Sequence, residues 1–94
     1  MEKRIELNFN NSISRLAGNS YGQEIYSKQV EDIIDLFGKN VIVIPDYIED
    51  IAISFIQGFT AKIFEKISKD TFFEHIVIEA NEKVKNKFRK SVYF

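Results

Sequence analysis

The stretch 41-VIVIPDYIEDIAISFIQGF-59 decides the fold, because it holds a buried strand, a turn and the start of a buried helix in direct succession. Residues 41–44 are β-branched throughout, and an unbroken apolar run of this kind is typical of a strand covered on both faces at the centre of a sheet. Pro45 has no N–H to donate and ends the strand, and residues 46–50 predict a polar turn. Residues 52–67 then predict a helix buried on most of its sides, with these side chains inward: Phe55, Ile56, Phe59, Ile63, Phe64 and Ile67.

The segments on either side add further strands and helices. Residues 4–9 alternate apolar and polar side chains, which is the period of a half-buried strand. Apolar positions spaced by three and four predict an amphipathic helix within residues 21–37, which Gly38 would end with a left-handed cap. Residues 75–80 predict a third strand and residues 82–92 a closing helix. The inward positions of these two helices are Tyr26, Val30, Ile33, Ile34 and Phe37 in the first and Val84, Phe88 and Val92 in the last.

Strands that alternate with helices predict right-handed crossovers and a small open α/β domain. We expect residues 1–94 to form one domain, with a mostly parallel or mixed sheet of three to four strands flanked by helices. A fourth strand could lie in residues 11–17 and pair with the first strand as a hairpin. Gly58 costs its helix about 1 kcal/mol relative to alanine, and close approach of a neighbouring strand would offset that cost.

The composition excludes several classes of protein. The 94 residues include no cysteine, so neither a disulfide framework nor a thiolate metal site is expected to hold the fold together. Residues 1–9 carry charges with no apolar segment of signal-peptide length after them, and no segment approaches the roughly 20 apolar residues that span a bilayer. We therefore expect a cytoplasmic protein with no membrane contact, and no motif implies a cofactor.

Charge is distributed unevenly along the chain. The net charge is −1, but all 14 acidic residues lie within residues 1–82, and five of the 13 basic residues lie within residues 83–94. So weak an overall balance does not attract nucleic acid by counterion release alone, which leaves nucleic-acid binding by the closing helix as the weakest hypothesis. Its shared basic face comprises Lys83, Lys87 and Lys90. An acidic face would form if the first helix and the turn emerged on the same side, from Glu31, Asp32, Asp35, Asp46, Glu49 and Asp50.

Three short motifs carry a resemblance to a known family. They are Gly18 with Gly22-Gln23-Glu24 at the entry to the first helix, VIVI at residues 41–44, and Ser54-Phe55 at the start of the buried helix. In this order, the segments over residues 14–92 resemble the STAS-like domain family of unknown function, a bacterial relative of the anti-sigma-factor-antagonist fold. The resemblance implies a regulatory protein that binds other proteins.

The chain departs from the family pattern at positions that bear on function. The family commonly has an aspartate where this chain has Ile44, and a glycine where it has Tyr47. In related antagonists a kinase phosphorylates a serine within an Asp-Ser-Ser-like stretch, where this chain has Ala52, Ile53 and Ser54. The resemblance therefore implies Ser54 as a phosphorylation site and a histidine-kinase-type ATPase as the partner.

The residues themselves leave three roles open for Ser54. A hydroxyl at a helix start can accept a hydrogen bond from a free backbone N–H, and this structural cap is the favoured interpretation. A phosphate there would be attracted by the helix dipole but repelled by Asp46, Glu49 and Asp50 just upstream. A nucleophilic serine would need a base, and the single histidine, His75, lies in a different predicted element with no third member of a triad.

From these observations we expect a non-enzymatic regulatory protein-binding module that acts through the strand-to-helix turn at residues 46–54. Phosphorylation-controlled partner switching is its most specific form. The expected partner-binding residues are Asp46, Tyr47, Asp50 and Ser54, with Ser54 as the modified residue. The alternative is a stand-alone inhibitor of phage or mobile-element origin that blocks a bacterial defence or transcription complex. The oligomeric state is open, a homodimer included.

Overall fold

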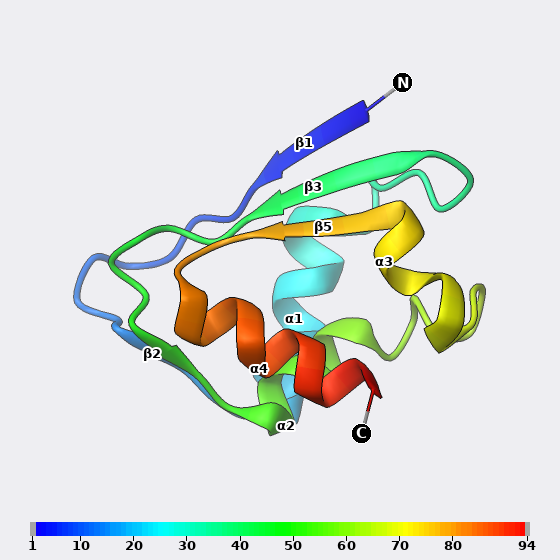
Figure 1. Ribbon diagram of the computed structural model, residues 1–94. Helices are drawn as coiled ribbons and strands as arrows, with labels where there is room; N and C mark the ends of the chain where they lie inside the picture. Colours follow the sequence, from blue (N-terminus) through cyan, green and yellow to red (C-terminus); the bar gives the residue numbers. More distant parts are fainter. Residues whose placement is uncertain (1, 94) are drawn as a thin grey trace.

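Three parallel strands form the main sheet of the computed structural model, which describes residues 2–93 (Figure 1). They are β1 (Glu2–Glu6), β3 (Lys39–Val43) and β5 (Ile76–Glu79), in the spatial order β1-β3-β5. The register places Ile5 beside Ile42 and Ile42 beside Ile78. The predicted α/β class and the central position of the β-branched strand are therefore confirmed.

A second, shorter ladder continues beyond the carboxyl ends of β1 and β3. Here β2 (Arg15–Leu16) pairs in parallel with β4 (Asp50–Ile51). The expected hairpin between residues 11–17 and the first strand is wrong. Because the chain leaves β1 and β3 in the same direction, the two following segments run side by side once more, and the Ala52 N–H donates to the Leu16 carbonyl at 2.7 Å.

The main sheet has helices on one face only (Figure 1). Residues facing the helices are buried, such as Ile5, Ile76 and Ile78, whereas Val77 is 38% exposed on the opposite face. The expectation that the central strand is covered on both faces holds only in part: no helix lies over the open face, although Val41 of β3 is still buried there. The open face is crossed instead by an ion pair between the two outer strands, in which Arg4 Nη1 lies 2.8 Å from Glu79 Oε2.

The helices are short, and several end earlier than the sequence predicts. They are α1 (Asn19–Ile25), continued by a π-helical turn η1 (Tyr26–Val30), α2 (Ile53–Thr60), a 3-10 turn η2 (Lys69–Thr71), α3 (Phe72–His75) and α4 (Glu82–Tyr93). The closing helix matches its prediction, with Val84, Phe88 and Val92 buried. The segment predicted as a helix over residues 52–67 is regular only to Thr60 and continues as turns.

The first predicted helix, over residues 21–37, differs most. It begins at Asn19 and ends at Val30. Of the inward positions predicted for its last turns, Ile34 packs against the core, but Ile33 and Phe37 are wrong, since they are 47% and 98% exposed. Gly38 is not a left-handed cap either. Among residues 2–93 only Gly18, before α1, has a positive φ, which is 99°.

A buried amide organises the end of that segment and the start of β3. The Asn40 side chain is fully buried, and its Nδ2 donates to the carbonyls of Asp35 at 2.7 Å and His75 at 3.1 Å. Its Oδ1 accepts the Asp35 N–H at 2.9 Å. A buried amide must find such partners, so these bonds fix the chain between η1 and β3 relative to the start of β5.

The helices α1 and α2 pack with their backbones in contact, and two glycines permit this. A Cβ on Gly22 would overlap the Phe55 carbonyl of α2, and a Cβ on Gly58 would overlap the Asn19 carbonyl of α1. The sequence predicted close approach at Gly58 but assigned it to a strand, and the neighbour is a helix. The glycines thereby fix where α2 begins relative to α1.

Aromatic rings fill the space between these helices and α4. Phe59 is fully buried and makes edge contacts with Tyr26 at 5.8 Å and Phe88 at 6.1 Å between ring centroids, and it stacks on Phe55 at 6.0 Å. Such pairs add to the stabilisation that burial of the ring area supplies. The core thus joins η1, α2 and α4 into one layer beneath the sheet.

Candidate functional site

The candidate site is the corner formed by residues 45–54, which connects β3 to α2. The corner begins with a turn in which the Ile48 N–H donates to the Pro45 carbonyl at 3.0 Å. It is anchored to the preceding part of the chain, since the Glu49 N–H donates to the Ser14 carbonyl at 2.7 Å. Backbone bonds alone therefore give the corner a fixed shape.

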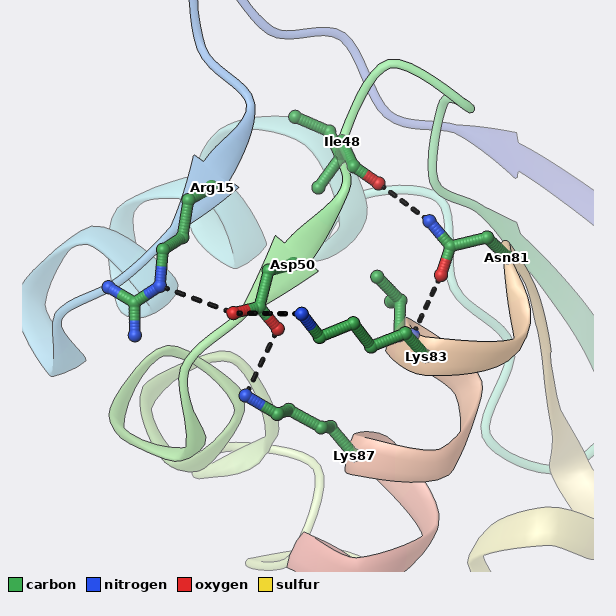
Figure 2. Close-up of polar contacts among 7 residues, drawn as sticks. Arg15, Ile48, Asp50, Asn81, Lys83 and Lys87 are labelled. Atoms are coloured by element: carbon green, nitrogen blue, oxygen red, sulfur yellow. Dashed lines mark hydrogen bonds and ion pairs between the residues drawn. The ribbon is translucent and has the colours of Figure 1, made fainter.

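Three cationic side chains converge on Asp50 at this corner (Figure 2). Lys87 Nζ of α4 lies 3.0 Å from Asp50 Oδ1, while Arg15 Nε of β2 lies 3.4 Å and Lys83 Nζ of α4 lies 3.8 Å from Oδ2. Oδ1 is shielded from water, and the Lys87 ammonium is the cation nearest to it. The carboxylate joins the second ladder to the closing helix.

These neighbours favour the ionised form of Asp50. The Lys87 ammonium has the largest effect, followed by the Ile51 backbone N–H, and together with the charge of Lys83 they lower the pKa from 3.8 to about 2. Partial burial of the carboxyl acts in the opposite direction and does not cancel this effect. Asp50 is therefore ionised and compensated at neutral pH, which is the signature of a structural ion-pair cluster.

Ser54 does not cap its own helix, and the favoured interpretation of the sequence is wrong on this point. The N-cap of α2 is Ala52, which makes no side-chain cap bond, and Ser54 is the second residue of the helix. Its Oγ instead accepts the Gly18 N–H at 3.1 Å. The exposed hydroxyl thus links the start of α2 to the residue before α1.

Tyr47 and Asp46 occupy the outer part of the corner. The Tyr47 hydroxyl donates to the Phe9 carbonyl at 2.7 Å and accepts the Phe9 N–H at 3.2 Å, so it closes the long connection after β1. The residue is still 38% exposed. Asp46 is exposed at the turn itself. Of the four expected site residues, Asp50, Ser54 and Tyr47 each hold a contact within the chain, and Asp46 faces solvent.

Asn81 is a residue of the corner that the sequence prediction missed. Its Oδ1 accepts the Val84 N–H at 2.9 Å, so it caps α4, and its Nδ2 donates to the Ile48 carbonyl at 2.9 Å (Figure 2). An asparagine directly before an amphipathic helix is a recognised N-cap signal that would have found the first of these roles. Nothing in the sequence indicates its hydrogen bond to the Ile48 carbonyl.

An exposed hollow of about 450 Å³ lies beside the corner, between the first turn of α2 and the last turns of α4. It is lined by Ile53 and Gln57 from α2 and by Lys90 and Ser91 from α4. Ile53 is 40% exposed and is the neighbour of Ser54 in the chain. An exposed apolar side chain that lines the hollow therefore directly precedes the exposed Ser54 in the chain.

Neither the acidic face expected from the first helix and the turn nor the basic face expected on the closing helix forms as a single surface. Asp35 lies before the start of β3 and Asp46 after its end, so the strand separates them, and Glu31 pairs with Lys62 of the segment after α2 at 3.3 Å. On α4, Lys83 and Lys87 turn to Asp50, whereas Lys90 lines the hollow. The basic face is thus divided between the ion-pair cluster and the hollow.

His75 and Ser54 serve different parts of the fold. The His75 Nδ1 lies 2.7 Å from the Gly38 carbonyl near the start of β3, whereas the Ser54 hydroxyl binds the Gly18 amide. Neither ring nor hydroxyl is the hydrogen-bond partner of the other. Within residues 2–93, no three His, Asp or Glu side chains gather to hold a metal ion, and no helix has the length and apolar character needed to cross a bilayer.

Comparison of the chain with protein-family models, with curated proteins and with solved structures finds no match. The resemblance to STAS-like domains stays a prediction from the motifs. What the structure defines is a class of architecture, a two-layer α/β domain with a parallel sheet, and a corner in which three neighbouring cations compensate the charge of Asp50.

Proposed function

We propose that this protein is a non-enzymatic regulatory module that binds a protein partner at the corner of residues 45–54 and the adjoining hollow, and that phosphorylation of Ser54 releases the partner. The observation that carries the proposal is that two exposed residues follow each other in the first turn of α2: Ile53, an apolar side chain that lines the hollow, and Ser54, a serine that can be modified. An apolar contact next to a modifiable hydroxyl is what a switchable interface requires.

The rigidity of the corner supports this proposal. The cluster around Asp50, the Asn81 bond to Ile48 and the Tyr47 bonds to Phe9 hold the backbone from three directions. A surface that is already ordered loses little conformational entropy when a partner binds. The corner therefore presents its exposed side chains, Asp46 and Ile53, in a fixed arrangement.

The electrostatics of the corner also suit a phosphate on Ser54. The sequence predicted repulsion from the nearby carboxylates, but the charge of Asp50 is compensated by Lys87, Arg15 and Lys83. A phosphoserine adds roughly −1.5 to −2 charges at neutral pH. That charge would lie beside the apolar contact at Ile53, where a partner packed against the hollow would have to desolvate it.

A capture experiment with four forms of the chain tests the proposal. Immobilised wild type, Ser54→Ala, Ser54→Asp and the control Ser68→Asp are exposed to lysate of the source cells, and each captured protein is purified and titrated against all four forms. Ser68 is an exposed serine before η2, remote from the corner in the chain, so its substitution adds the same charge elsewhere. We expect wild type, Ser54→Ala and Ser68→Asp to bind alike, and Ser54→Asp to bind at least about tenfold more weakly.

Equal affinity of all four forms would contradict the proposal. Thermal unfolding of Ser54→Asp separates loss of the interface from loss of the fold. A captured ATPase of the histidine-kinase type would favour partner switching, whereas an effector that binds regardless of charge at Ser54 would favour a stand-alone inhibitor.

A further inference from the structure

The outer edge of β5 has unpaired backbone groups. The Ile44 N–H donates to the Glu79 carbonyl at 2.9 Å, so Glu79 directs its backbone groups toward β3, and by alternation Ile78 directs its N–H and carbonyl away from the sheet. No strand of residues 2–93 lies beyond β5 (Figure 1). The sheet can therefore accept a further strand at this edge.

The two edges of the sheet differ in how they are protected. The other outer strand, β1, has the sequence EKRIE, in which every residue but Ile5 is charged, and charged edges discourage pairing with other chains. β5 has the sequence IVIE, with three apolar residues in succession. Of the two outer strands, only β5 has the apolar composition that favours pairing with a further strand.

A groove of about 340 Å³ runs along this edge of β5, between α3 and α4. Ile76 and Ile78 line it from the strand, Phe73 and Tyr93 line it with aromatic rings, and Lys85 and Arg89 line it with cations from α4. The two rings contact each other, with centroids 5.5 Å apart. The groove thus combines an apolar wall with two positive charges.

The two cations of the groove are only lightly engaged within the chain. Lys85 Nζ lies 3.8 Å from the exposed Glu82 carboxylate, and Arg89 Nη1 donates to the Asn86 side chain at 3.2 Å. The strand's own carboxylate, Glu79, is paired with Arg4 across the open face of the sheet. Lys85 and Arg89 are therefore positioned to accept carboxylates from outside.

We propose that this groove binds an extended acidic peptide of a partner protein, which adds to the sheet as a strand beside β5. Lys85 and Arg89 are four residues apart on α4, or about 6 Å along the helix axis. Alternate residues of an extended strand are about 6.6 Å apart on one face. An acidic residue at every second position of the peptide would therefore meet both cations, while its backbone pairs with Ile78.

A second copy of this chain is a poorer occupant of the groove. If two copies paired edge to edge through β5 about a twofold axis, the same surface of each copy would meet itself. Lys85 and Arg89 of one copy would then face Lys85 and Arg89 of the other, and like charges in contact are destabilising. The charge of the groove thus selects an acidic partner over self-association. This inference concerns a different surface from the corner and does not depend on Ser54.

Fluorescence anisotropy with labelled peptides tests this proposal. The probe is the hexapeptide Glu-Val-Glu-Val-Glu-Val, and the comparison peptides are Lys-Val-Lys-Val-Lys-Val and the rearranged Glu-Glu-Glu-Val-Val-Val. We expect the alternating acidic peptide to bind most tightly, and the pair Lys85→Gln with Arg89→Gln to weaken it by about tenfold. The matched pair Lys28→Gln with Lys66→Gln removes the same charge from other surfaces and should leave the affinity unchanged.

Hydrogen exchange supplies an independent measurement, because the bound peptide should slow exchange of the Ile78 amide in particular. Equal binding of the rearranged peptide, or no loss in the Lys85 and Arg89 variant, would overturn the proposal. So would tighter binding of a labelled single-stranded oligothymidylate. A concentration-dependent dimer in sedimentation that protects the same amide would overturn it in favour of a second copy.

Discussion

Lys87 of α4 places its ammonium 3.0 Å from the Asp50 carboxylate of β4, so an ion pair ties the last helix of the chain to the corner at which α2 begins. Lys83 and Arg15 complete the cluster around the same carboxylate. The corner that the sequence marks as a candidate site is thus held by side chains from both ends of the chain.

The pH dependence of stability should report this cluster. The pKa of Asp50 is lowered to about 2 in the folded chain, so its ionised form stabilises the fold above its ordinary pKa of 3.8 and that stabilisation is lost as the pH falls through about 2. We expect Asp50→Asn to be less stable than wild type at pH 7, and the difference to shrink between about pH 4 and pH 2. Urea unfolding across this range measures it.

Asp46→Asn is the matched control for this prediction, because it removes an exposed carboxylate from the same corner. A constant difference between wild type and Asp50→Asn from pH 7 to pH 2.5 would show that the stabilisation does not come from ionisation of Asp50.

The contact between α1 and α2 should tolerate no side chain at its two glycines. Gly22→Ala and Gly58→Ala would each drive a methyl group into a backbone carbonyl of the other helix, which cannot rotate away. We expect each substitution to lower the free energy of unfolding by about 3 kcal/mol, at the upper end for overpacking. Denaturant titration measures the loss. Gly38→Ala, at a glycine without positive φ, should be close to neutral, and a similar loss there would argue against the close approach.

The hydroxyl of Tyr47 should contribute more to the stability of the fold than its aromatic ring. Tyr47→Phe removes two hydrogen bonds to the Phe9 backbone, and we expect a loss of about 1 to 2 kcal/mol in the free energy of unfolding. Faster proteolysis within residues 8–14 should accompany it, since this hydroxyl closes that connection. Tyr93→Phe, at a residue that is 55% exposed, is the control and should change neither quantity.

Asn40 should be among the least replaceable polar residues of the chain. Asn40→Ala leaves the carbonyls of Asp35 and His75 without their donor in a buried place, at an expected cost of about 2 to 3 kcal/mol. Asn40→Asp should cost more at pH 7, because it sets a charged carboxylate against those same oxygens, and it should recover partly at pH 4. If both variants unfold at the wild-type denaturant concentration, the bonds of Asn40 are dispensable.

The sequence predicted the sheet better than the ends of the helices, for a physical reason. An unbroken β-branched run such as residues 41–44 has few alternatives to a central strand. The spacing of Ile33 and Phe37 continues the apolar pattern of the first helix, but the chain leaves that helix at Val30 and exposes both side chains. Periodicity records which positions would share a face if the helix continued, and it carries no information on where tertiary contacts end it.

The sequence likewise predicted the position of the candidate site but not its contacts. The position of the corner after the central strand could be predicted, because Pro45 and the polar residues after it mark the turn. The contacts of Asp50 could not, because Lys83 and Lys87 are more than 30 residues away in the sequence and reach it only when α4 runs back beneath the second ladder. Ser54 was assigned to a local cap, whereas its partner is Gly18 of another helix entry.

The order of strands also has a consequence for how the chain is made. β3 pairs with β1, which precedes it in the chain, and with β5, which begins only at Ile76, so its second neighbour is translated more than 30 residues after β3 itself. In a nascent chain that has not yet reached Ile76, the β3 edge that holds Ile42 and Ile44 would lack its β5 partner. That edge could then pair with other unfinished chains. Pairing with β5 therefore protects the central strand β3 against association with other chains.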